Sequence, residues 1–133
     1  MRITLETTDF DTMKTDGSGN DVTTTTNLNF IKKAMQVTES FFEARLQVTS
    51  VGTVYPPDPC FDYSPSATDV ANGFAATDLL IYVLYIGDSS ISYGATGVSC
   101  KWVTGQSTPD TTLQQGRPTV GRIIFNTYNL VDQ

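Results

Sequence analysis

The chain has 133 residues, 39% of them hydrophobic and 11% aromatic, which is the composition of an ordinary globular protein. Its length allows one hydrophobic core of useful size, so we expect a single domain or subdomain over residues 1–133. A net charge of −6 disfavours roles that require neutralising phosphate, so we expect no nucleic-acid partner and no binding to anionic membranes. The longest apolar run, residues 79–86, has the length of a strand and is too short for a transmembrane segment.

The amino-terminal part of the chain predicts a strand, a helix and a second strand. Residues 2–8 (RITLETT) alternate between the two faces of a strand with one drier side, and residues 16–26 have the composition of a loop. Residues 45–54 (RLQVTSVGTV) alternate again, which indicates a second strand. A strand, a helix and a strand in this order predict a parallel βαβ crossover.

The helix between these strands is amphipathic. Asn27 or Asn29 would cap its start, and apolar positions recur at helical spacing over residues 30–44. The apolar stripe consists of Ile31, Ala34, Met35, Thr38, Phe41 and Phe42. We assign this stripe to core packing and the remaining charged positions to a solvated face.

The carboxy-terminal part predicts further strands. Residues 55–78 are rich in proline and small residues and indicate an irregular excursion across the surface. Residues 79–87 (LLIYVLYIG) are apolar without interruption, as in a central strand that is covered on both faces. Residues 90–103 contain glycines, which indicate an edge strand, a bulge or a close backbone approach, and residues 119–128 form the last predicted strand.

The predicted central strand needs more cover than the sequence visibly supplies. Both faces of residues 79–86 require a layer, yet one helix of about four turns can cover only one face. We therefore expect the second layer to come from outside the chain, either from a missing carboxy-terminal half of the domain or from neighbouring copies of the chain. An isolated soluble monomer is the least expected state.

The chain lacks the side chains of common catalytic sites. It contains no histidine, which excludes the usual serine or cysteine triads and any histidine-ligated metal site within the chain. No pair of carboxylates has a spacing that indicates acid and base partners, and no glycine-rich loop has a phosphate-binding pattern. We therefore expect no catalytic residue, no metal ligand and no cofactor in this chain alone.

Two cysteines, Cys60 and Cys100, are compatible with one disulfide or with two buried thiols. A bridge would close a loop of about 40 residues and stabilise the fold by about 4 kcal/mol in the chain-entropy model. Packing in cores and interfaces is assigned to Tyr82, Tyr85 and Trp102, and a rigid extended turn is assigned to Tyr55 with Pro56 and Pro57. None of these aromatic residues is given a role in ligand binding.

Several short segments of the chain resemble, in the same order, segments of the leishmanolysin family of zinc metallopeptidases. They are RITLETTDFDT, EARLQVTSVGTV, TDLLIYVLYIG, YGATGVSC and GRPTVGRIIFN. Together they span nearly all 133 residues and resemble the amino-terminal half of that catalytic domain. The resemblance implies a metzincin-type, zincin-like α/β subdomain, with a twisted, mostly parallel five-stranded sheet, one main helix and an antiparallel edge strand.

The resemblance also implies where the chemistry of the family would lie. Its active-site helix carries His-Glu-x-x-His, which supplies two zinc ligands and the general base, and a later histidine completes the site. That helix would follow residue 133, so no ligand and no base carries over to a residue of this chain. Zinc is expected only in the completed parent domain.

Two features of the family carry over to residues of this chain. In zincins an antiparallel edge strand pairs with the extended peptide substrate, and the matching segment is Ser92, Tyr93, Gly94, Ala95 and Thr96. The same segment could equally be an edge that the missing half of the protein covers. Cys60 and Cys100 resemble two cysteines of the disulfide-bonded cell-surface and secreted members, which implies a bridge and an extracellular or cell-surface location.

Three functions follow as hypotheses. The first is the amino-terminal subdomain of an extracellular leishmanolysin-like zinc metallopeptidase that acts on a protein substrate. The second is a non-catalytic structural or adhesive protein, in a surface coat or filament, that keeps the scaffold and assembles by strand addition. The third, an inhibitor or decoy that presents the edge strand to another protease, has only geometry in its favour.

Overall fold

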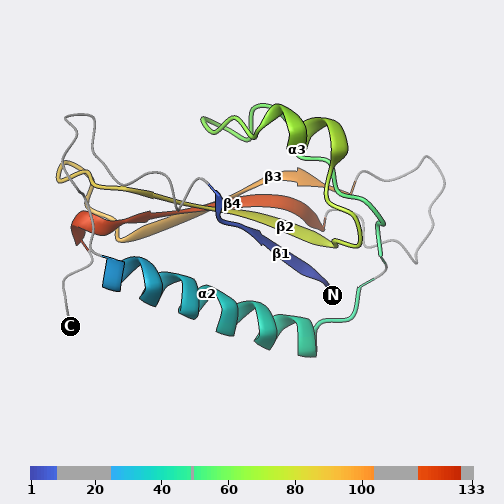
Figure 1. The fold of residues 1–133 in the computed structure, drawn as a ribbon, viewed down its shortest axis with the longest axis horizontal. Coiled ribbons are helices and arrows are strands. Elements are labelled where there is room, and N and C mark those ends of the chain that lie inside the picture. The colour runs from blue at the N-terminus through green and yellow to red at the C-terminus, as the bar shows by residue number, and fades with distance from the viewer. Residues whose placement is uncertain (9–24, 49, 104–116, 130–133) are drawn as a thin grey trace.

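The computed structural model describes residues 1–8, 25–48, 50–103 and 117–129 (Figure 1). In chain order the elements are β1 (Ile3–Glu6), α2 (Thr25–Arg45), α3 (Ala67–Asn72), β2 (Leu79–Ile86), β3 (Ala95–Trp102), β4 (Pro118–Asn126) and a 3-10 turn, η1 (Thr127–Asn129). Residues 16–24 of the predicted loop over residues 16–26 lie outside the described residues. Because α2 begins at Thr25, the predicted caps Asn27 and Asn29 lie within the helix, and that prediction is wrong.

Four strands form one sheet in the order β1-β2-β4-β3. β2 pairs in parallel with β1 on one side and with β4 on the other, and β3 pairs antiparallel with β4 at an edge. The α/β class, the mostly parallel sheet and the central place of residues 79–86 are therefore confirmed. β3 occupies an edge of the sheet, as the glycines in its sequence indicate.

The predicted strand over residues 45–54 is absent from the part of the chain that the structure describes, so the sheet has four strands and not five. Leu46 N still donates to Phe42 O at 2.8 Å, so helical bonding continues where the strand was expected to begin. Only Val54 makes a strand-type contact, an isolated antiparallel bridge with Phe74. The alternating pattern is misleading here because it shows which side chains would share a face but not whether the segment has a partner strand, and no strand of the sheet pairs with it.

α2 forms the layer on one face of the sheet (Figure 1). Its residues Leu28, Ile31 and Met35 pack against Val83 and Tyr85 of β2. These three helical positions are spaced i, i+3 and i+7, so they form one stripe along the helix. The alternate side chains of β2 point to the opposite face, as the pleat of a strand requires.

Residues 51–74, which include α3, form the layer on the opposite face. Val54 and Cys60 from this segment pack against Leu80 and Tyr82 of β2. The ring of Tyr82 also meets the ring of Tyr63, with the two centroids 4.9 Å apart. Most of the segment is irregular, so no period in its sequence could identify it as a core layer.

Both faces of the central strand are buried by atoms of this chain. Leu80 and Tyr82 on one face are 0% exposed, and Val83 and Tyr85 on the other are 1% exposed. The expectation that β2 needs a layer from outside the chain is therefore wrong. The segment interpreted as a surface excursion supplies that layer.

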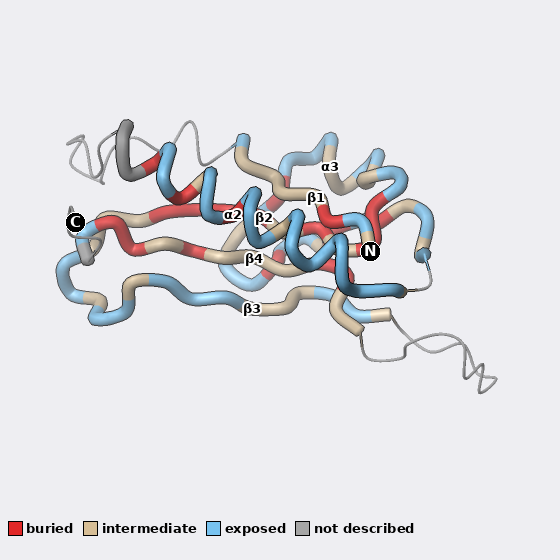
Figure 2. Tube along the Cα trace, turned by 90° about the horizontal axis from the view of Figure 1, so that it is seen from below, coloured by how far each residue is buried: buried red, intermediate tan, exposed pale blue. Residues whose placement is uncertain are grey.

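The disulfide between Cys60 and Cys100 is present, with the two Cα atoms 5.2 Å apart and a sequence separation of 40. It joins the irregular layer to β3, and Cys60 is fully buried. The bridge is thus confirmed. Buried residues concentrate in β2, β4 and the inner side of α2, whereas much of β3 is exposed (Figure 2). Neither helix within the described ranges is long and apolar enough to cross a membrane.

Candidate functional site

The segment that the sequence indicates as a candidate site lies at the β3 edge. Ala95 and Thr96 begin β3, whereas Ser92, Tyr93 and Gly94 belong to the connection that leads into the strand. All of these residues except the half-buried Gly94 are exposed. Within the described residues β4 is the only strand beside β3, so the other edge of the β3 backbone faces outward. A strand from another molecule could therefore approach it.

A buried asparagine holds the connection before β3. Asn126 at the end of β4 is fully buried, and its Nδ2 donates to Asp88 O at 2.9 Å and to Ile91 O at 3.1 Å. Its Oδ1 accepts from Asp88 N at 3.2 Å, and its backbone N donates to Gly94 O at 2.8 Å. Ser90 Oγ and N donate to the Asp88 carboxylate, which lowers the pKa of Asp88. These bonds fix the path of the chain into the candidate edge.

The side of β3 that faces α2 carries small residues. Ile123 of β4 pairs with Val83 of β2 and with Gly97 of β3, so all three positions lie on the face on which α2 packs. Ala95 pairs in the same way with Phe125. Ile123 and Phe125 remain only half-buried, because the small β3 residues beside them add little cover. This apolar surface beside α2 is called the β4 floor below.

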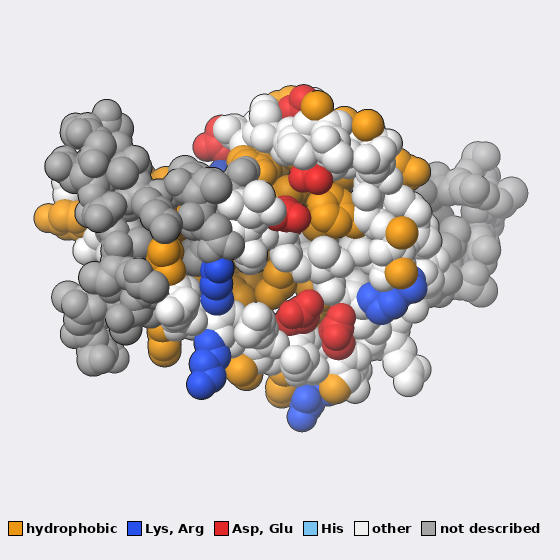
Figure 3. Space-filling view, in the orientation of Figure 1, with side chains coloured by type: hydrophobic (Ala, Val, Ile, Leu, Met, Phe, Trp, Pro, Cys, Tyr) orange, Lys and Arg blue, Asp and Glu red, His pale blue; other side chains and the backbone are white. Residues whose placement is uncertain are grey.

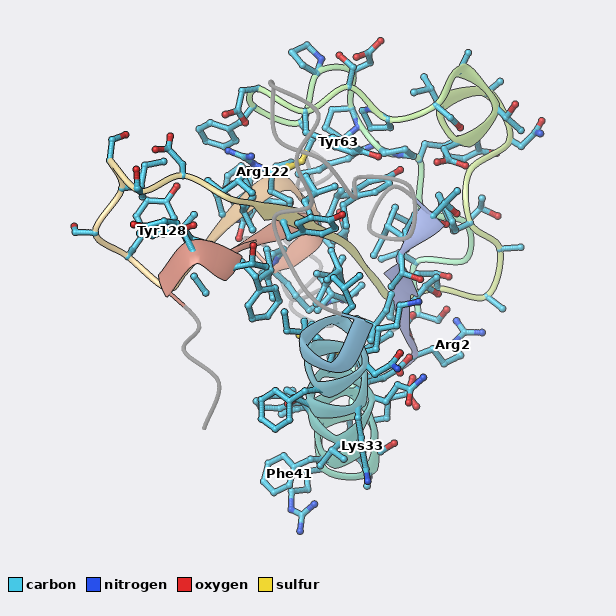
Figure 4. The ribbon with its side chains drawn as sticks, turned by 60° about the vertical axis from the view of Figure 1, so that its left-hand side comes forward. Arg2, Lys33, Phe41, Tyr63, Arg122 and Tyr128 are labelled. Atoms are coloured by element: carbon cyan, nitrogen blue, oxygen red, sulfur yellow. A yellow bond between two sulfur atoms is a disulfide. The ribbon has the colours of Figure 1, made fainter. Side chains whose placement is uncertain are left out.

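α2 carries a second apolar stripe, which is exposed. Phe30, Val37 and Phe41 are 71%, 63% and 49% exposed. With Ala34 they are spaced i, i+4, i+7 and i+11, and these four residues are called the outer stripe. Phe41 projects away from the sheet, on the side of α2 opposite Arg2 (Figure 4).

The outer stripe corrects the predicted role of the helix. Ile31 and Met35 pack in the core as predicted, whereas Ala34, Thr38, Phe41 and Phe42 are exposed. The apolar arc of α2 is wider than its contact with the sheet, so only its inner part is buried. Near the carboxy-terminal end of α2 the Phe41 ring meets the Phe42 ring edge-on, with the two centroids 5.4 Å apart. The guanidinium carbon of Arg45 lies 3.9 Å from the centroid of the Phe41 ring.

A cavity of about 390 Å³ lies between β1 and α2. Its lining is apolar at Ile3, Leu5, Met35 and Val83 and polar at Thr4, Thr7, Lys32, Gln36 and Glu39. Burial raises the pKa of Glu39, and the nearby Glu43 carboxylate raises it further. On this side of the molecule hydrophobic side chains are visible beside acidic and basic ones (Figure 3). The lining holds no nucleophile with an adjacent base among the described residues.

The start of β1 is fixed by a charged pair. Arg2 N donates to Asp78 Oδ2 at 2.8 Å, and its guanidinium donates to both carboxylate oxygens at 3.3 Å. Burial alone would raise the pKa of Asp78, but the hydrogen bonds from Arg2 and Ser50 outweigh it and lower the pKa to about 2. The pair anchors the free edge of the sheet at β1 and has no catalytic partner nearby among the described residues.

A second cleft was missed by sequence reasoning. It measures about 210 Å³, lies at the end of β3 and is lined by Tyr55 and Trp102, to which the sequence analysis assigned no binding role. The register of β3 against β4 shifts between Ser99 and Trp102, so simple alternation cannot predict where Trp102 points. No sequence pattern signals that Tyr55, far away in the chain, lies beside it.

The described residues do not fit a zinc site. No group of three or more His, Cys, Asp or Glu side chains among them is placed to hold a metal ion, and the whole sequence contains no histidine. Comparison of the chain with protein-family models, curated proteins and solved structures found no match.

Proposed function

We propose that this chain is the amino-terminal subdomain of an extracellular leishmanolysin-like zinc metallopeptidase and that it is not catalytic by itself. The observation that carries the proposal is apolar surface left without full cover, namely the exposed outer stripe of α2 and the half-buried β4 floor. The expected lack of cover over β2 is not found, because this chain covers both faces of β2. The uncovered apolar surface lies beside α2 instead.

This uncovered surface is suited to packing against another secondary-structure element. Phe30, Val37 and Phe41 of the outer stripe are exposed, and Ile123 and Phe125 of the β4 floor are only half-buried. Full burial of a Val or Phe side chain contributes about 1.5–3 kcal/mol, so covering several of them supplies enough energy to dock a helix. In the proposed parent the helix with His-Glu-x-x-His packs on this surface.

Within the parent this chain would bind and orient the substrate. The β3 edge, with Ser92–Thr96 at its beginning, would exchange main-chain hydrogen bonds with an extended peptide, and its small side chains leave the backbone approachable. Asn126 would hold that edge in place through the connection before β3. Zinc, held by residues outside this chain, would supply the activated water when bound.

The coding sequence beyond codon 133 tests the proposal. We expect His-Glu-x-x-His within the next helical segment, and zinc in equimolar amount in the protein purified from its native source. A stop codon directly after Gln133, or a downstream sequence without that motif in a protein free of zinc, would contradict the proposal.

A structural or adhesive protein is the second candidate, and the free edge of β3 favours it. Eight residues of β3 present an open backbone edge, which can template strand addition between copies and so build a filament or a surface coat. The shifts in register near Lys101 act against it, because bulges and lysines are devices that blunt an edge. Native particles made only of chains of this mass would favour this candidate, and a monomer at high concentration would contradict it.

A further inference from the structure

The cleft at the end of β3 lies apart from the outer stripe of α2. The irregular layer forms one side of it, and the last residues of β3 with the start of β4 form the other. It is lined by Val51, Thr53, Val54, Tyr55, Lys101, Trp102, Val103 and Thr119. Its volume of about 210 Å³ admits a side chain but no folded element.

Two aromatic rings on this cleft are open to solvent. Tyr55 and Trp102 are each 47% exposed, although Val54 beside them is buried. Large aromatic side chains with a polar tip are the commonest anchors of protein interfaces, because they offer much contact area at little cost in conformational entropy. Two of them on one small cleft therefore indicate a binding surface for an apolar ring or side chain.

A lysine gives the cleft a charge opposite to that of the molecule. The shift in register pairs Lys101 with Val120, and its Nζ donates to Tyr55 O at 2.9 Å. An ammonium group has three donors, and among the described residues only this bond uses one of them. In a chain of net charge −6 a cation held at this position favours a ligand with a carboxylate.

We propose that the cleft binds an extended peptide segment of another protein, with a proline ring seated against Tyr55 and Trp102 and an adjacent acidic side chain on Lys101. Proline-rich segments bind aromatic grooves because they are already extended and lose little entropy on binding. The site is built from the irregular layer, β3 and β4 alone, so it is independent of the proposed zinc domain. Its failure and the failure of the proposed function are therefore separate results.

Intrinsic fluorescence tests the site directly, because Trp102 is the only tryptophan in the chain. The probe is the synthetic peptide acetyl-Asp-Pro-Leu-Pro-Asp-Pro-amide, titrated into the full chain with its disulfide intact. We expect a saturable shift of the Trp102 emission to shorter wavelength. The Tyr55→Ala variant should raise Kd about tenfold, the loss typical of an interface anchor.

Two matched variants separate binding from folding. Tyr128→Ala removes another exposed tyrosine, outside the cleft lining, and should leave Kd unchanged within about twofold. Lys101→Glu changes a solvent-exposed side chain and should reverse the charge preference, so that a peptide with lysine at both aspartate positions binds better than the original. Far-ultraviolet circular dichroism confirms that each variant is folded.

Three results would overturn the proposal. The first is a Trp102 emission that does not respond to the peptide at millimolar concentration. The second is binding that persists unchanged in both Tyr55→Ala and Lys101→Glu. The third is a response to chitotriose but not to the peptide, which would identify the cleft as a sugar site.

Discussion

The two faces of the sheet are covered by different means and to different extents. One face meets the long helix α2, yet the outer stripe of that helix stays exposed and the β4 floor is only half-buried. The other face meets the irregular segment 51–74, which buries Cys60 and Tyr82 completely and is tied to β3 by a disulfide. The presence of a regular helix therefore does not predict how completely a face of the sheet is buried. The burial depends on the apolar area in contact with that face.

Loss of the disulfide is expected to have the largest effect, because it holds the irregular layer on the sheet. Replacing Cys60 and Cys100 together with serine should lower the free energy of unfolding by about 4 kcal/mol, given the sequence separation of 40. Urea denaturation measures the change. Wild-type protein in reductant is the control and should lose the same amount. An unchanged midpoint in reductant would mean that packing alone retains this layer.

Two substitutions on α2 separate its inner side from its outer stripe. Met35→Ala removes a buried side chain from the core and should cost about 3 kcal/mol in unfolding free energy. Val37→Ala, two residues further along the same helix, removes a mostly exposed side chain and should change it by less than about 0.5 kcal/mol. Equal losses in the two variants would show that the outer stripe is already packed in the isolated chain.

Asn126→Ala tests how the candidate edge is held. The substitution removes the bonds to Asp88 and Ile91 and should lower the free energy of unfolding by about 2 kcal/mol. Hydrogen exchange should also become faster in residues 88–94 than in the rest of the sheet. Asn72→Ala, at an exposed position in α3, is the control and should leave both measurements unchanged. Exchange that stays slow would assign the rigidity of this connection to other contacts.

Acid should weaken the anchor of β1 by a smaller amount, because Arg2 is partly exposed and solvent screens the pair. The pKa of Asp78 falls from 3.8 to about 2 on folding, so the pair stabilises the protein fully above pH 4. That contribution is lost as the pH falls from about 4 through 2. Asp78→Asn removes the carboxylate, so the variant should show a flatter dependence of unfolding free energy on pH over this range. Identical slopes in variant and wild type would contradict the assignment.

The sequence predicts the centre of the sheet better than its cover. The unbroken apolar run of β2 and the glycines of β3 report directly on burial and on an edge, and both predictions are confirmed. The strand expected at 45–54 is wrong, because alternation shows which side chains would share a face but not whether the segment has a partner strand. The second layer was missed because residues 51–74 have no period to detect.

The candidate sites also differ in how far the sequence predicts them. The resemblance locates the substrate edge at Ser92–Thr96, and its role stays a prediction. The cleft with Tyr55 and Trp102 depends on a shift in register and on contacts between distant segments, and no local pattern encodes either. The outer stripe of α2 was visible in the sequence as part of one apolar arc, but the extent of its burial depends on the width of the sheet beneath it.

The central claim is that the outer stripe of α2 is covered in the intact native protein, and side-chain footprinting with hydroxyl radicals tests it most directly. The isolated chain and the protein purified from its native source would be labelled in parallel, with the exposed Tyr128 as the internal reference. We predict that Phe30 and Phe41 react in the isolated chain and are protected severalfold in the native protein. Equal labelling of both residues in the two samples would contradict the claim, because the surface beside α2 would then need no partner.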